Sequence, residues 1–192
     1  MANKKEQQAR KQAAITVERL HLLLEADFDN GKLYWKFRPR EHCKSDRHFH
    51  QFNSRCAGQE AFTSFQTAGY PFGTIEGHYF TAHRVLFAMY HNRWPGEIDH
   101  IDGDRTNNRI TNLREVTRSE NMTNRKAFAS SKTGLLNIHP YNNNGIYVCL
   151  AALGVKRVFG ANQIEEAVEF RDKVRAENGY SPARDAKKPT IH

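Results

Sequence analysis

The fold of this chain is decided by one stretch, IDHIDGDRTNNRITNLREVTRSEN, which occupies residues 98–121. Residues 98–101 can form a short strand, and Asp102-Gly103-Asp104 supplies a turn. Residues 113–116 predict a returning strand, and Thr117 with Glu120 forms a capping box that opens a helix. We therefore expect a strand-loop-strand-helix unit.

Four polar side chains of this unit are expected to converge in one cleft. Asp99 and His100 alternate across the first strand, Asn112 lies at the return strand, and Asn121 lies in the first helical turn. An imidazole titrates in the range of a general base for water, and a carboxylate is a hard ligand suited to magnesium or manganese. Phosphodiester hydrolysis needs both groups. A neutral neighbour such as Asn112 holds an imidazole in one tautomer without adding charge.

This stretch resembles the HNH (ββα-metal, His-Me finger) endonucleases, specifically their phage and homing branch. The resemblance runs without a gap from Ile98 to Arg125. The upstream segment His83-Arg84-Val85-Leu86 and the approach Trp94-Pro95 also resemble this branch.

The resemblance implies a role for each polar residue of the unit. Asp99 and Asn121 would hold one Mg²⁺ or Mn²⁺ ion per active site, and His100 would be the general base. Asn112 would orient His100, and Asn108 would shape the connecting loop. Because the last motif position is Asn121 and not His, we expect DNA phosphate to complete the metal shell.

A second resemblance, to the apetala (ethylene-response-factor) DNA-binding domain, covers residues 131–178. It is carried by Gly145-Ile146-Tyr147, Gly154-Val155-Lys156-Arg157, Phe159-Gly160 and Glu165-Glu166-Ala167. It implies a three-stranded sheet laid against the major groove of DNA. The matching contact candidates are His139, Tyr147, Lys156 and Arg157. The middle strand is apolar over 148–152 where plant members carry polar readers, so we do not expect their base-reading rules to transfer.

Basic residues also flank the expected active site. We expect them to contact DNA phosphates, although a solvated basic face is the usual alternative for scattered charges. These candidates are Arg105, Arg109, Arg114, Arg125 and Lys126.

The composition favours a polyanionic partner. Among 192 residues, Lys plus Arg number 29 and Asp plus Glu number 21, giving a formal net charge of +8, which suits double-stranded DNA. There is no apolar run of about 18 residues, and the polar start lacks the apolar core of a signal peptide. We therefore expect no membrane partner and a cytoplasmic protein, in a bacterial host if phage-encoded. Monomer and homodimer both stay open.

The pattern along the chain predicts an α+β protein built from small modules. The last module is expected to be a three-stranded sheet plus a helix, and residues 39–54 are interpreted as a basic loop. The expected segments are a basic extension at 1–15, a helix plus β-hairpin region at 16–82, a ββα-metal nuclease core at 83–126, an apetala-like domain at 131–180 and a tail at 181–192.

Two groups of residues carry weaker signals. His42, Cys43, His48, His50 and Cys56 have spacings that fit no standard zinc site, so no zinc is assigned. His83 lies on an apolar helix, where a lone histidine is more often a core residue than a participant in the active site.

Two alternatives to a DNA endonuclease stay open. One is a noncatalytic, sequence-specific DNA-binding regulator on the same scaffold, and the other is a nuclease that acts on RNA. The second is disfavoured because no segment resembles an RNA-recognition motif. One active site cuts one strand, so the choice between nicking and double-strand cutting also stays open.

Overall fold

The computed structural model describes residues 14–124, 127, 131–142, 145–180, 182–183 and 185. It has the expected α+β character, with short helices and small antiparallel sheets. Its contacts divide the chain into two compact units, Met1–Glu115 and Val116–His192. Within the described residues, no helix has both the length and the apolar character needed to cross a bilayer.

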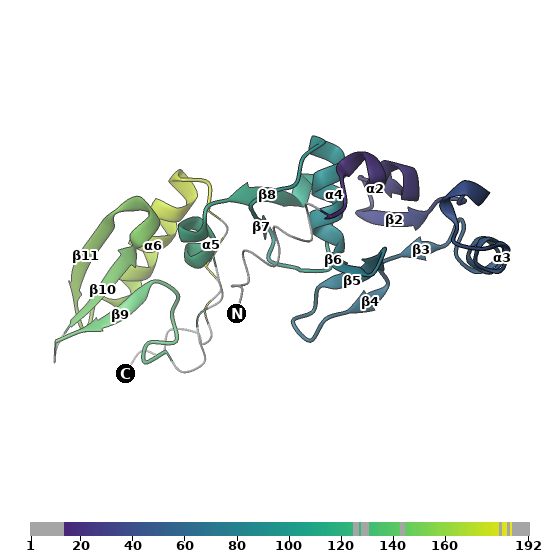
Figure 1. Ribbon diagram of the computed structural model, residues 1–192. Coiled ribbons are helices and arrows are strands. Elements are labelled where there is room, and N and C mark those ends of the chain that lie inside the picture. The colour runs from purple at the N-terminus through teal and green to yellow at the C-terminus, as the bar shows by residue number, and fades with distance from the viewer. Residues whose placement is uncertain are drawn as a thin grey trace. The chain divides into compact units, whose positions relative to one another are not determined.

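The first unit contains two three-stranded antiparallel sheets, ordered β1-β2-β3 and β4-β5-β6, and the strand β7, which pairs with β8 (Figure 1). The elements up to β8 are α2 (Val17–Leu23), β1 (Leu24–Asp27), β2 (Lys32–Trp35), α3 (Asp46–Arg55), β3 (Glu60–Ala61), β4 (Ser64–Phe65), β5 (Pro71–Ile75), β6 (His78–Thr81), α4 (Ala82–His91), β7 (Glu97–His100) and β8 (Leu113–Val116), with short 3₁₀ helices at Arg40–His42 and Ile110–Asn112.

One hydrophobic core joins the N-terminal sheet, the β5–β6 hairpin and α4. Leu20 of α2, Leu33 of β2, Ile75 of β5 and Val85 of α4 all belong to it, and each is at most 1% exposed. Figure 1 shows α4 beside α2 and β2, which it contacts. The helix that precedes the motif is therefore anchored on the same apolar residues as the N-terminal strands.

The segment between α4 and β7 is held by hydrogen bonds to a side chain of α4 and to the backbone of Ile15. Arg84 donates to the carbonyls of Pro95 and Gly96, both at 2.7 Å. The Trp94 indole N–H donates to the carbonyl of Ile15 at 2.9 Å. These bonds fix the point at which β7 starts, and with it the position of the motif.

The interpretation of residues 39–54 as a loop is wrong, because most of that stretch and Arg55 form α3. The Ser45 hydroxyl caps this helix by accepting from the His48 amide at 3.2 Å. Phe52 packs edge-on against Trp35, with ring centroids 5.8 Å apart, and the Arg38 guanidinium lies 3.7 Å from the Phe52 ring centroid. Aromatic packing outside the helix therefore stabilises a segment whose own composition is strongly polar.

The second unit consists of α5 (Arg118–Asn124), the antiparallel sheet β11-β10-β9 and α6. The bounds are β9 (Ile138–Tyr141), β10 (Gly145–Leu150), β11 (Val155–Gly160) and α6 (Ile164–Glu177), with a 3₁₀ helix at Ala151–Leu153. The predicted capping box at the start of α5 is confirmed, since the Thr117 amide donates to Glu120 Oε2 at 2.6 Å and the Glu120 amide to Thr117 Oγ1 at 3.3 Å.

Helix α6 packs on one face of the three-stranded sheet. Its buried positions include Ala167, but also Arg171 and Arg175, which are only 2% and 1% exposed. Arg171 donates to the Leu136 carbonyl at 3.1 Å and to Asp185 at 2.8 Å. Two charged side chains thus serve as core residues of this unit.

Candidate active site

His100 is the best-defined polar residue of the motif. It lies at the end of β7 and is 4% exposed. Its Nε2 lies 3.0 Å from Asn108 Oδ1. Because a carboxamide oxygen can only accept, Nε2 must carry the hydrogen, and the lone pair of the neutral ring lies on Nδ1.

Asn112 was expected to orient His100, whereas in the structure the side chain that contacts the His100 ring is that of Asn108. Asn112 Oδ1 accepts from the Asp102 amide at 3.1 Å, and its Nδ2 donates to Asp102 Oδ1 at 2.9 Å and to the Asn107 carbonyl at 2.8 Å. Asn112 stands at the base of the loop and closes it, while Asn108 projects from the loop to the imidazole. Asn112 therefore acts on His100 only through the loop that it holds.

Two carboxylates of the loop between β7 and β8 accept hydrogen bonds from other residues of the same loop. Asp102 accepts from the Asp104 amide at 2.8 Å and from Asn107 Nδ2 at 2.7 Å, and Asp104 accepts from the Thr106 amide at 2.9 Å. Burial acts to raise the pKa of Asp102, but hydrogen bonds from Asn107 and Asn112 outweigh it and hold that pKa below the ordinary value. Asp102 and Asp104 are thus engaged in shaping the loop.

The N-terminal hairpin turn supports the segment that carries Asn108. Gly31 has a φ of +68°, and a Cβ atom there would lie 2.4 Å from both the Asn108 carbonyl carbon and the Arg109 nitrogen. The Ile110 amide donates to the Phe28 carbonyl at 3.1 Å. Only glycine allows this approach, and Asn108 itself is only 3% exposed.

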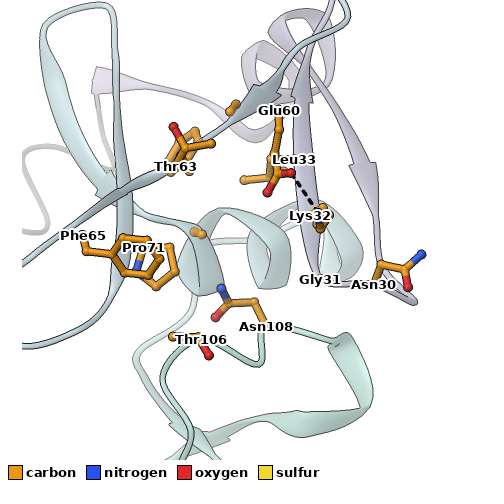
Figure 2. A pocket seen from close by; sticks show the side chains of 13 residues that line it. Asn30, Gly31, Lys32, Leu33, Glu60, Thr63, Phe65, Pro71, Thr106 and Asn108 are labelled. Atoms are coloured by element: carbon orange, nitrogen blue, oxygen red, sulfur yellow. Dashed lines mark hydrogen bonds and ion pairs between the residues drawn. The ribbon is translucent and has the colours of Figure 1, made fainter.

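A pocket of about 240 Å³ borders Asn108. Figure 2 shows Asn108 and Thr106 on one side of it and the Lys32–Glu60 ion pair, at 2.8 Å, on another. Phe65 completes the lining from β4. Residues outside the motif therefore shape the surroundings of the amide that holds His100.

Asp99 and Asn121 were expected to hold a divalent cation. Asp99 is 8% exposed and forms an ion pair with Arg114 at 3.0 Å, while Asn121 lies in α5 of the second unit. Among the described residues, no group of three or more His, Cys, Asp or Glu side chains gathers as a metal cluster. Carboxylate and carboxamide oxygens are each hard ligands of the kind that magnesium prefers. A cation bound by Asp99 would compete with Arg114 for the carboxylate.

The flanking basic residues differ in how they are engaged. Arg105 donates to the Ala68 carbonyl at 2.5 Å, and its guanidinium lies 4.9 Å from the Tyr70 ring centroid. Arg109 is exposed, and Arg114 is paired with Asp99. The remaining two candidates, Arg125 and Lys126, lie outside the described residues.

In the second unit, three of the four DNA-contact candidates share one face of the sheet. His139 and Tyr147 are register partners with rings 5.1 Å apart, and Lys156 Nζ lies 4.8 Å from the Tyr147 ring centroid. Arg157 is directed differently, since its guanidinium lies 5.2 and 4.9 Å from the Phe159 and Phe170 rings. Phe159 and Phe170 belong to the core side of the sheet.

A comparison with protein families gives a match, whereas two comparisons with individual proteins do not. A search of curated proteins and a search of solved structures found no match. A family model described as HNH endonuclease matches residues 80–123, a range that starts in β6 and covers α4, β7 and β8. His100 and its hydrogen-bond partner Asn108 both lie inside that range. The match therefore supports a nuclease of the HNH type.

Proposed function

We propose that the chain is a metal-dependent endonuclease that hydrolyses phosphodiester bonds of double-stranded DNA, one strand per active site. The proposal rests on the buried hydrogen bond of 3.0 Å between His100 Nε2 and Asn108 Oδ1, inside a segment that matches HNH endonucleases. A neutral imidazole held in this tautomer has its lone pair on Nδ1, which is the state that a general base requires.

The chemical step follows from this tautomer. His100 Nδ1 accepts a proton from water as the water oxygen attacks phosphorus, and the bond from phosphorus to the leaving ester oxygen breaks. The products are a terminal phosphate and, after protonation of the leaving oxygen, a terminal hydroxyl. Asn108 engages Nε2, so the accepted proton can go only to Nδ1. A divalent ion held by Asp99 and Asn121 would stabilise the charge on the phosphate and the leaving oxygen.

The Asp99–Arg114 ion pair bears on how such an ion would bind. Its Nη2–Oδ2 distance is 3.0 Å, so part of the Asp99 negative charge is already neutralised. We expect weak binding of Mg²⁺ or Mn²⁺ to the protein alone and tighter binding once DNA phosphate supplies further oxygen ligands.

We further propose that the second unit contacts DNA through the sheet face that carries His139, Tyr147 and Lys156. Basic and aromatic side chains on one sheet face suit contacts to phosphate and base edges, and the net charge of +8 favours the same partner. The likeness of the motif to phage and homing nucleases supports assignment to that type. We expect the protein to act in the cytoplasm, which is that of a bacterial host if the protein is phage-encoded.

The direct test is cleavage of supercoiled plasmid by purified protein with magnesium, manganese or a chelator. Conversion to open-circle or linear DNA is expected only with metal. His100→Ala is expected to lower the rate by at least about 1000-fold while DNA affinity stays within about twofold.

His91→Ala is the matched control, because His91 is an exposed histidine at the end of α4. Wild-type protein that binds DNA but does not cut with either metal would favour the noncatalytic regulator, which the Asp99–Arg114 ion pair also fits. A His100→Ala variant that still cuts would refute the assignment of the base.

A further inference from the structure

Two aromatic rings, those of His83 and Tyr70, lie next to the His100 imidazole. His83 of α4 is 7% exposed, and its ring centroid lies 5.1 Å from that of His100, with the planes at 69°. Tyr70, just before β5, lies 5.1 Å from His83 and 6.0 Å from His100. Tyr70 comes from outside the segment that matches the family model.

His83 is a poor choice for packing alone. Its Nδ1 is buried without a hydrogen-bond partner among the described residues, and an unsatisfied buried nitrogen destabilises a fold. Thr81 stands at the N-cap of α4, yet its hydroxyl does not cap the helix and lies 3.4 Å from His83 Nε2. Among the residues that the structure describes, His83 thus lacks a hydrogen bond at Nδ1 and Thr81 does not cap its helix, and His83 itself lies beside His100.

We propose that His83 is a positioning residue, whose ring packs against His100 and, together with Asn108, fixes the plane of the catalytic imidazole. The proposal rests on the nuclease function proposed above. One hydrogen bond at Nε2 fixes one atom of the ring but leaves the plane free to tilt about it. A second contact from His83 removes that freedom, and the contact between Thr81 and His83 Nε2 holds His83 in turn.

The charge state of His83 is compatible with this role. Burial, with smaller contributions from His100 and Arg84, lowers the pKa of His83 to about 3. The ring is therefore neutral under ordinary cleavage conditions. A neutral neighbour adds no positive charge beside an imidazole that becomes cationic when it accepts a proton.

The test compares His83→Ala, His83→Phe and the control His91→Phe in single-turnover cleavage at saturating protein. We expect His83→Ala to cut roughly 30-fold more slowly with DNA affinity within about twofold, because a misaligned base slows the chemical step and not binding. His83→Phe keeps the ring but loses the contact with Thr81, so a loss of about threefold is expected. His91→Phe is expected to leave the rate unchanged.

A second readout does not depend on cleavage. Long-range proton–nitrogen NMR spectra of the free protein distinguish the ring nitrogen that carries hydrogen, and His100→Ala identifies the His100 signals. We expect one tautomer, protonated at Nε2, in the wild type and shifts towards tautomer averaging in His83→Ala.

The outcomes separate the two proposals. If wild-type protein does not cut DNA, the nuclease function fails, but the spectra still decide whether His83 holds His100. Unchanged His100 signals in folded His83→Ala and His83→Phe, or a loss confined to DNA affinity, would overturn the positioning role. Thermal unfolding establishes that each variant is folded. If His83→Ala does not fold, His83→Phe alone tests the positioning role.

Discussion

The two units of this protein both bury polar side chains, but they do so with different consequences. In the first unit, His100, Asn108 and Asn112 are at most 9% exposed, and their hydrogen bonds leave the His100 lone pair at Nδ1 available for chemistry. In the second unit, Arg171 and Arg175 are at most 2% exposed, and they bond to backbone and side chains of the same unit. Burial of a polar group therefore indicates fixed geometry. A role in catalysis requires in addition an atom left with the capacity to react.

The largest effect is expected from Arg171→Ala, which tests whether the buried arginines serve stability alone. The change leaves the Leu136 carbonyl and Asp185 without this partner, so the free energy of unfolding of the second unit should fall by about 3–5 kcal/mol. This free energy is measured by chemical denaturation, monitored with a spectroscopic probe placed in the second unit. Lys173→Ala is the control on the same helix, since that side chain is 75% exposed. A loss of unfolding free energy below about 1 kcal/mol would contradict the conclusion that the buried Arg171 stabilises the second unit.

Asn108→Ala tests the proposal that the buried Asn108 amide orients His100 for catalysis. Removing the acceptor leaves His100 Nε2 without its partner and the tautomer unselected, so the single-turnover rate should fall roughly 100-fold with little change in DNA affinity. Asn112→Ala is the contrasting variant, because the three hydrogen bonds of the Asn112 side chain all go to Asp102 and Asn107. It should lower stability by about 1–3 kcal/mol as well as the rate. Equal loss of stability in both variants would argue against separate roles.

Much of the local structure could be predicted because its causes are local. The apolar helix expected around His83 is α4, and the capping box of Thr117 and Glu120 predicted α5. Helix α3 was missed because its apolar positions are few, and packing of Phe52 on Trp35 and Arg38 decides its conformation.

The partner of His100 could not be predicted, since it depends on contacts distant in sequence. Which asparagine reaches the imidazole is set by the path of the loop between β7 and β8, and Gly31 packs against that loop from more than 70 residues away. The burial of Arg171 was missed for a related reason, because its partners Leu136 and Asp185 lie far along the chain. The signal available in the sequence was a run of asparagines, which indicated the site without assigning its members.

A smaller effect, on DNA affinity, is expected from substitutions on the exposed face of the second unit's sheet. Lys156→Ala should weaken DNA binding by a few-fold and lower the slope of log affinity against log salt by about 1, as loss of one phosphate contact predicts. Arg157→Ala should change this slope less, because the Arg157 guanidinium lies against Phe159 and Phe170. Binding titrations at several salt concentrations measure both. A larger slope change for Arg157→Ala would mean that the sheet binds DNA through its other side.

The smallest effect concerns Glu115, which ends the first unit and holds the approach to β7. It accepts from Arg93 at 2.5 Å and from the Gly96 amide at 2.6 Å, and these hydrogen bonds, from Arg93 first and then Gly96, lower the Glu115 pKa from 4.5 to about 2. Since the folded state favours the carboxylate, its contribution is fully present above about pH 4.5 and is lost as the pH falls towards 2. Glu115→Gln should therefore lower the melting temperature slightly at pH 7, and the difference from wild type should shrink across that window. A difference that stays constant with pH would show that the contribution of Glu115 comes from packing and not from its charge.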